Sequence, residues 1–185
     1  MREFVFKMRG GIWTLLFLGV LFMVRASSLE QKCACLLLVV LGQAWRCWSA
    51  GCIGLYRGEN VKANRLATRG PYALMRNPLY FGNWVIGLGW SILAGVKGVL
   101  LFTVSFWVLY VLVIIPHEES FLRVKFGADY EDYCSRVGRF CPYSLRLEDI
   151  RGGFDPSIIM RSEIHTIIST TIGTAIIIGV SLCYT

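Results

Sequence analysis

Long runs without a charged residue divide this chain. Three of them, Asn77–Val96, Gly98–Pro116 and Ile164–Thr185, approach the roughly 20 residues that cross about 30 Å of hydrocarbon. Two other runs are less clean, because Gly10–Val24 is short and Cys33–Tyr56 contains an arginine. The pattern predicts about five membrane-spanning helices, over residues 8–26, 33–56, 78–96, 98–116 and 162–184.

The composition agrees with this pattern. Hydrophobic residues make up 55% of the 185 residues, and the mean hydropathy is +0.56. A soluble domain of this size rarely has so little polar surface to offer to water. We therefore expect an all-α, polytopic membrane protein that forms one domain over residues 1–185. Pro116 is expected to end or kink the fourth span.

The positions of the basic residues predict the orientation in the membrane. Residues 57–77 and 117–161 are rich in Lys and Arg, as is the N-terminus, whereas few basic residues remain on the other side. The positive-inside rule then places the N-terminus and both segments in the cytoplasm and the C-terminus opposite. This topology also accounts for the net charge of +7 without a nucleic-acid partner. The alternative for the first apolar run is a cleaved signal peptide.

Two polar clusters flank the third and fourth predicted spans. The first is Arg69–Asn83 and the second is His117–Glu119. The five residues "AGVKG" form a short connection between these spans, so an antiparallel hairpin is expected. A hairpin returns to the side it left, and so Arg76, Asn77 and Tyr80 are expected within side-chain reach of Glu118 and Glu119.

The residue types in these clusters favour a small zwitterionic ligand. Arginine binds carboxylate or phosphate, often in a bidentate way, and the adjacent acids attract an amine. Tyr72 and Tyr80 offer flat faces to an aromatic ring or a sulfonium. S-adenosylmethionine carries all of these groups. The alternative is that Arg76 pairs with Glu118 or Glu119 to close the hairpin, with the tyrosines forming an interfacial belt.

The order of the motifs adds a family resemblance. "GPYALMRNPLY", followed by "PHEESFLRVKFGADYEDYCSRVGRFCP", resembles the isoprenylcysteine carboxyl methyltransferase family and its phospholipid methyltransferase relatives. That family has a G-x-Y…R-H-P-x-Y segment, a membrane hairpin, an E-E pair and an F-G-x-x-Y-x-x-Y…R-x-x-P segment. The resemblance covers residues 43–142. It implies an integral membrane enzyme that uses S-adenosylmethionine to methylate a lipophilic or membrane-associated acceptor.

The resemblance also implies roles for individual residues. Glu118 and Glu119 match the family's acidic pair that helps to hold the cofactor, and Arg139 matches an arginine placed to meet an acidic group of the acceptor. These three are candidates for catalysis, together with Arg46, which is a candidate from its position inside an apolar run and not from the resemblance. One departure is Asn77, which stands where the family has histidine and cannot titrate near neutral pH. A carboxylate acceptor needs no base, whereas an amine or thiol would need Glu118, Glu119 or His117 as a proton sink. The expected cofactor residues are Gly70, Tyr72, Leu74, Arg76, Asn77, Pro78, Tyr80, His117 and Glu118.

Arg46 lies within a predicted span, where an ionisable residue is a functional hypothesis by default. It is expected to pair with Glu118, Glu119 or Glu163, or to meet the acceptor or a lipid head group. The seven cysteines form no C-x-x-C spacing, so packing is the expected role and no metal site is predicted. Two alternatives to a methyltransferase stay open: a sterol-reductase-like membrane enzyme and a non-enzymatic scaffold or transport subunit.

Overall fold

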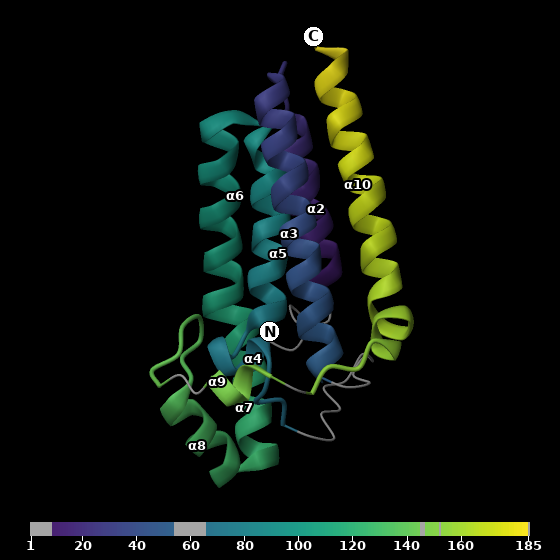
Figure 1. Cartoon of the computed structure of the whole chain (residues 1–185). Helices are drawn as coiled ribbons and strands as arrows, with labels where there is room; N and C mark the ends of the chain where they lie inside the picture. Colours follow the sequence, from purple (N-terminus) through teal and green to yellow (C-terminus); the bar gives the residue numbers. More distant parts are fainter. Residues whose placement is uncertain (1–8, 54–65, 145–146, 152, 185) are drawn as a thin grey trace.

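The computed structural model describes residues 9–53, 66–144, 147–151 and 153–184, and these residues form helices joined by short connections. The predicted all-α class is confirmed. Two π-helical turns, η1 (Tyr110–Ile114) and η2 (Ile159–Glu163), join α6 to α7 and lead into α10. The helices of the bundle are α2 (Arg9–Phe22), α3 (Leu29–Ile53), α5 (Pro78–Ile92), α6 (Gly95–Leu109) and α10 (Ile164–Cys183), and the shorter ones are α4 (Pro71–Leu74), α7 (Ile115–Phe126), α8 (Ala128–Arg136) and α9 (Leu147–Ile150) (Figure 1).

Three helical stretches within the described ranges are long and apolar enough to cross a membrane: Leu29–Ile53, Gly95–Phe126 and Ile159–Cys183. Gly10–Phe22 is apolar but shorter. The 15 residues of α5 extend about 22 Å, less than the roughly 30 Å of a hydrocarbon core. An integral membrane protein is therefore confirmed, whereas the count of five spans stays a prediction.

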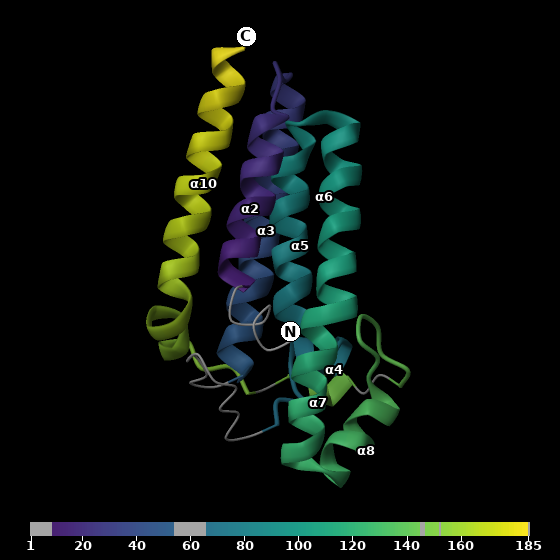
Figure 2. The same cartoon turned by 180° about the vertical axis from the view of Figure 1, so that it is seen from behind.

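The helices of the bundle alternate in direction. In Figures 1 and 2, α2, α5 and α10 run away from the end that carries α8, and α3 and α6 run back toward it. The predicted hairpin of α5 and α6 is present, with a turn at residues 93–94. Residues 66–77, 117–144, 147–151 and 153–156 consequently lie at one end of the bundle, which we call the site end. Its assignment to the cytoplasm stays a prediction.

The fourth predicted span extends beyond its expected boundary. Pro116 does not end the helix, which continues to Phe126 and is capped by Gly127 at a φ of 50°. A proline removes one backbone donor and clashes with the preceding turn. Here η1 ends two residues before Pro116, and a π-turn is one way in which a helix accommodates such a break in its hydrogen bonding. The continuation carries Glu118 and Glu119 out of the bundle on a helix rather than on a loop.

Glycines bring α3 and α5 close together. A Cβ added at Gly82 would lie 3.1 Å from the Gly42 carbonyl oxygen, and one at Gly89 would lie 2.9 Å from the Cys35 carbonyl oxygen. Small residues allow such backbone approach in membrane bundles. Gly42 and Gly82 are therefore close-packing residues of the contact between α3 and α5.

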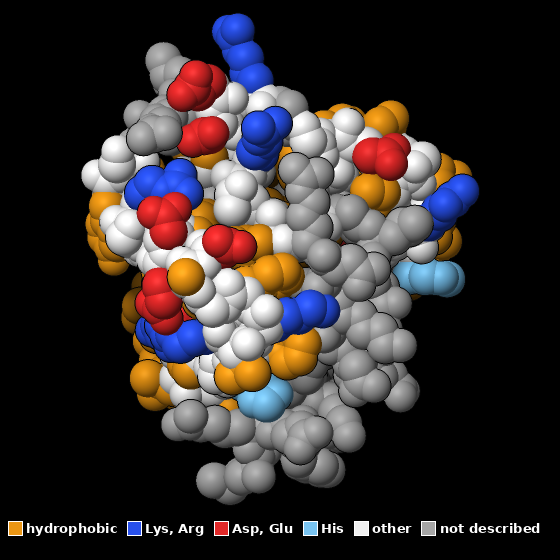
Figure 3. All heavy atoms as spheres, turned by 90° about the horizontal axis from the view of Figure 1, so that it is seen from below, with side chains coloured by type: hydrophobic (Ala, Val, Ile, Leu, Met, Phe, Trp, Pro, Cys, Tyr) orange, Lys and Arg blue, Asp and Glu red, His pale blue; other side chains and the backbone are white. Residues whose placement is uncertain are grey.

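The site end has a small hydrophobic core of its own. Tyr130, Tyr133 and Val137 are buried there, separate from the larger core of the bundle. The Tyr133 hydroxyl donates to the Tyr72 carbonyl at 2.7 Å, which ties α8 to α4. Figure 3 views this end directly and shows basic and acidic side chains interspersed over it.

Candidate functional site

A cavity of about 1090 Å³ extends from the site end into the bundle. At the site end its walls come from α4, from the residues that begin α5, and from α7 and α8. Deeper in the bundle it continues between α2, α5 and α10, and we call this part the membrane arm. Its walls are lined by Trp13, Phe17, Trp90, Thr170, Gly173 and Ile176, among others.

Glu119 joins two arginines at the site end. Arg139 approaches it with Nη2 2.8 Å from Oε2, and its Nε lies 3.1 Å from the same oxygen. Arg76 Nη2 lies 3.4 Å from the other carboxylate oxygen, and Arg76 Nη1 also donates to the Cys134 sulfur. Glu119 is buried, whereas the Arg139 side chain is 39% exposed. Arg76 lines the cavity and Arg139 does not, so the two cations differ in access to a ligand.

The pKa values of Arg76 and Tyr72 at this end are shifted by burial and by neighbouring groups. Burial lowers the pKa of the Arg76 guanidinium, but Glu119 and Cys134 outweigh it, so the pKa lies above its ordinary value. Burial raises the pKa of the Tyr72 phenol well above its usual range, and neighbouring Tyr133 adds to the effect. Arg76 is thus a fixed cation and Tyr72 a fixed neutral ring.

A second charged cluster lies deeper in the bundle. Arg46 Nη2 lies 2.9 Å and 3.2 Å from the two carboxylate oxygens of Glu163, and both side chains are buried. Arg46 Nη1 donates to Asn83 Oδ1 and, at 3.4 Å, to the Leu79 carbonyl. Of the partners considered for Arg46 from the sequence, the structure therefore selects Glu163.

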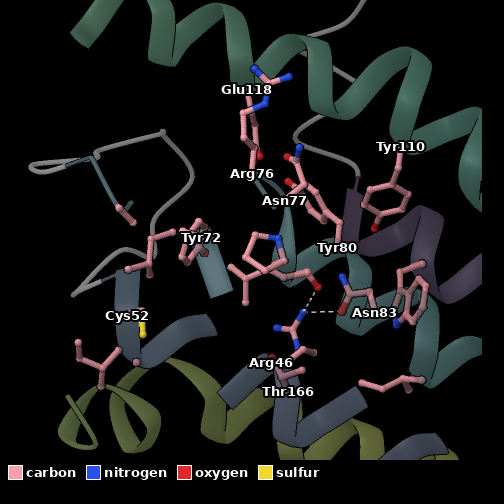
Figure 4. Close-up of a pocket in the computed structure, with 18 of the residues that line it drawn as sticks. Arg46, Cys52, Tyr72, Arg76, Asn77, Tyr80, Asn83, Tyr110, Glu118 and Thr166 are labelled. Atoms are coloured by element: carbon pink, nitrogen blue, oxygen red, sulfur yellow. Dashed lines mark hydrogen bonds between the residues drawn. The ribbon is translucent and has the colours of Figure 1, made fainter. Parts of the chain in front are cut away.

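Aromatic rings and amides lie between the two charged clusters. The rings of Tyr80 and Tyr110 are 4.8 Å apart, and both line the cavity. Figure 4 shows Arg76, Asn77 and Glu118 at one end of the cavity, Tyr80 and Tyr110 beside them, and Arg46 with Asn83 opposite. The Asn77 amide Nδ2 donates to the Arg139 carbonyl at 3.5 Å.

Most of the predicted site residues meet at this cavity. Arg76 lies beside Glu119, as the hairpin argument predicts. Gly70 instead serves the backbone: its φ is 63°, and an added Cβ would lie 2.6 Å from the Cys52 sulfur. The cavity is lined by Arg46, Tyr72, Arg76, Asn77, Pro78, Tyr80, Glu118 and Glu119, but not by Gly70, Leu74, His117 or Arg139.

Three polar or aromatic residues that line the cavity were not named as site residues from the sequence: Asn83, Tyr110 and Tyr130. Asn83 comes one helical turn after Tyr80, so the spacing alone places both on the same face of α5. Tyr110 lies in an apolar run and gives no signal. Tyr130 belongs to the F-G-x-x-Y-x-x-Y motif but was not named as a site residue, and its burial depends on how α8 folds back onto α4. Within the described residues, no group of three or more His, Cys, Asp or Glu is placed to hold a metal ion.

The chain is similar in sequence to proteins of a known family. The family model described as phospholipid methyltransferase matches residues 31–129, more than half of the chain. The chain belongs to the phospholipid methyltransferase family. The resemblance predicted from the motifs is confirmed. The match includes α3, α4, α5, α6 and α7, whereas α2 and α10 lie outside it.

Curated members and relatives match over part of their length. A probable protein-S-isoprenylcysteine O-methyltransferase of Oryza sativa subsp. indica is 36% identical over 81 residues, covering 43% of this chain and 42% of the relative. Methanethiol S-methyltransferase 2 of Bradyrhizobium diazoefficiens is 33% identical over 87 residues, covering 47% and 32%. A Delta(14)-sterol reductase of Schizosaccharomyces pombe is 32% identical over 90 residues, covering 46% and 20%. The chain thus spans less than half of these relatives, and no solved structure matches it.

Proposed function

We propose that this family member transfers a methyl group from S-adenosylmethionine to a lipophilic or membrane-associated acceptor. One observation supports this most directly: a single cavity joins a cluster of arginine, acid and tyrosine side chains to an arm between apolar helices. A polar cofactor and an apolar acceptor need such different surroundings, and the cavity offers both.

The side chains at the site end fit the functional groups of the cofactor. Arg76 is a fixed cation for a carboxylate, and Glu118 and Glu119 are acids for an amine. Tyr72 and Tyr80 present ring faces to a sulfonium or an adenine. The Arg76 Nε is buried and donates to no atom among the described residues, so a donor is left at the place where a ligand is expected.

Methyl transfer requires the acceptor to lie in line with the sulfonium methyl of the cofactor, which supplies the electrophile. The chain's contribution is to hold the two reactants in that geometry and to exclude water. Asn77 has no titratable group, so it cannot remove a proton from the acceptor. An acceptor that is already a nucleophile, such as a carboxylate, fits this site without a base at position 77.

Calorimetric titration of the protein in detergent with S-adenosylhomocysteine, the demethylated product, tests this function. We expect saturable binding, weakened by about tenfold to a hundredfold in Arg76→Ala, because a charged hydrogen bond contributes about 1.5–3 kcal/mol. Arg123→Ala is the matched control, since Arg123 pairs with Glu131 on the surface and does not line the cavity.

Two outcomes would overturn the proposal. If neither S-adenosylmethionine nor its product binds in the presence of membrane lipid, the scaffold reading replaces it. If a reduced nicotinamide dinucleotide binds instead, a sterol-reductase-like function replaces the proposed one, in line with the similarity to the sterol reductase.

A further inference from the structure

Arg46 is held from two sides in the wall of the cavity. Glu163 on η2 engages Nη2 with both carboxylate oxygens, at 2.9 Å and 3.2 Å. Asn83 and the Leu79 carbonyl, both from α5, engage Nη1. The guanidinium is planar, so contacts on both terminal nitrogens fix its orientation as well as its position. Its Nε is buried and donates to no atom among the described residues.

The two partners of Arg46 differ in their relation to the cavity. Arg46 and Asn83 line it, at the junction of the site end with the membrane arm, whereas Glu163 is not among the lining residues (Figure 4). Glu163 therefore acts on the cavity through Arg46. Its side chain is 1% exposed, so the carboxylate is placed behind the guanidinium rather than in the path of a ligand.

The backbone around Glu163 is irregular. Glu163 is the last residue of η2, and a π-turn shifts the direction of the side chains that follow. The other π-turn, η1, begins at Tyr110, which lines the same cavity. Single π-turns within α-helices occur frequently at functional sites. One irregular turn of the described chain therefore places Tyr110 in the cavity wall, and the other places Glu163 against Arg46, which lines that wall.

We propose that Glu163 is a positioning residue for methyl transfer: it orients Arg46, and Arg46 contacts the polar group of the acceptor. This proposal rests on the proposed function and extends it to α10, which lies outside the family match. The helix is then a part of the acceptor site as well as a wall of the membrane arm.

A purely structural role makes a different prediction. The Arg46–Glu163 pair also ties α10 to α3, and a tether can be rebuilt with its charges exchanged. In the double variant Arg46→Glu/Glu163→Arg the ion pair is kept, but the guanidinium now starts from α10 and a carboxylate faces Asn83. A tether role predicts that this exchange restores both stability and turnover. A positioning role predicts that it restores stability alone.

The experiment measures four variants in detergent for thermal unfolding, S-adenosylhomocysteine affinity and turnover. Turnover is followed as transfer of labelled methyl from S-adenosylmethionine to host membrane extract, with apparent KM from a dilution series. The variants are Glu163→Gln, Arg46→Glu, the charge exchange and Ser181→Ala. Ser181→Ala is the matched control, because it removes the hydrogen bond of the Ser181 hydroxyl to the Arg25 carbonyl, another tether of α10, away from the cavity.

We expect Glu163→Gln to lower turnover, or to raise the KM for the acceptor, by roughly tenfold to a hundredfold, because a misplacement of about 1 Å has an effect of this size. The affinity for the cofactor should stay unchanged. The charge exchange should unfold at a higher temperature than Arg46→Glu without regaining turnover, and Ser181→Ala should keep turnover.

The positioning role is wrong if Glu163→Gln retains parental turnover and KM, or if the charge exchange regains activity. Should the exchange fail to fold, Glu163→Gln decides alone, since it keeps the size of the side chain. Failure of the proposed function is seen separately, as absence of cofactor binding by the parent protein.

Discussion

Arg76 and Arg139 both pair with Glu119 at the site end, but they differ in burial and in access to the cavity. Arg76 is largely buried and lines the cavity, while Arg139 is partly exposed and lies outside the lining. The family resemblance predicts that Arg139 meets an acidic group of the acceptor, and in the structure Arg139 lies beside Glu119 at the site end. Both residues are arginines, so the residue type alone does not predict which of them lines the cavity.

Asn77 is the residue at which this chain departs from the family motif. Its amide contacts the Arg139 carbonyl, and the residue is buried in the cavity wall. Asn77→His introduces an imidazole with an ordinary pKa of about 6.5. We expect the pH dependence of turnover in this variant to gain a limb at about pH 6–7 that the parent lacks.

The comparison is made with Asn77→Gln, which also enlarges the side chain but adds no titratable group. Identical pH profiles for the histidine and glutamine variants would show that position 77 does not influence the reacting groups. Rates should be measured at saturating cofactor, so that a change in binding is not mistaken for a change in the chemical step.

At the scale of elements, the contact between α3 and α5 sets the position of Arg46 and of the residues that begin α5. Gly89→Ala places a methyl group 2.9 Å from the Cys35 carbonyl oxygen and 3.1 Å from the Leu38 Cβ. Overpacking of this kind costs about 1–3 kcal/mol, more than the roughly 0.5–1 kcal/mol that alanine gains in helix propensity. We expect a lower unfolding temperature in detergent.

Gly179→Ala on α10 is the control, because a Cβ there meets nothing within 4 Å. It should leave the unfolding temperature unchanged or raise it slightly. Equal effects of the two substitutions would show that α3 and α5 are not in close backbone contact.

Some of the contacts between elements could be predicted from the sequence, and others could not. The hairpin of α5 and α6 could be inferred from charge-free runs and a short connection, and it brings Arg76 to Glu119 as expected. The extension of the helix beyond Pro116 could not be inferred from the sequence, since it depends on a π-turn in an apolar run. The pairing of Arg46 with Glu163 was one of several open choices, because the position of α10 depends on packing and not on a local pattern.

At the scale of the whole molecule, the described residues form two hydrophobic cores of unequal size. The larger lies within the bundle, and the smaller is the core of the site end, around Tyr130, Tyr133 and Val137. Tyr133 and Tyr72 hold α8 against α4, so the walls of the cavity at the site end depend on the smaller core. Conditions that act on these tyrosines should therefore impair the site before they unfold the bundle.

Alkaline pH is such a condition. Burial raises the pKa values of Tyr72, Tyr130 and Tyr133 above the ordinary value of about 10. Because these pKa values are higher in the folded state, the neutral tyrosines contribute their full stabilisation of the fold below the unfolded pKa of about 10. This contribution is lost as the pH rises from about 10 toward the pKa values of the folded state. We expect the affinity for S-adenosylhomocysteine to fall above about pH 10 while the helical circular dichroism of the bundle persists.

Tyrosinate absorbance identifies the cause. Loss of affinity should coincide with late ionisation of the buried tyrosines, and Tyr133→Phe should lower affinity already at neutral pH, because it removes a hydrogen bond worth about 0.5–1.5 kcal/mol between α8 and α4. If helicity and affinity decline together, the two cores unfold as one unit. The site end would then owe its stability to the bundle rather than to its own tyrosines.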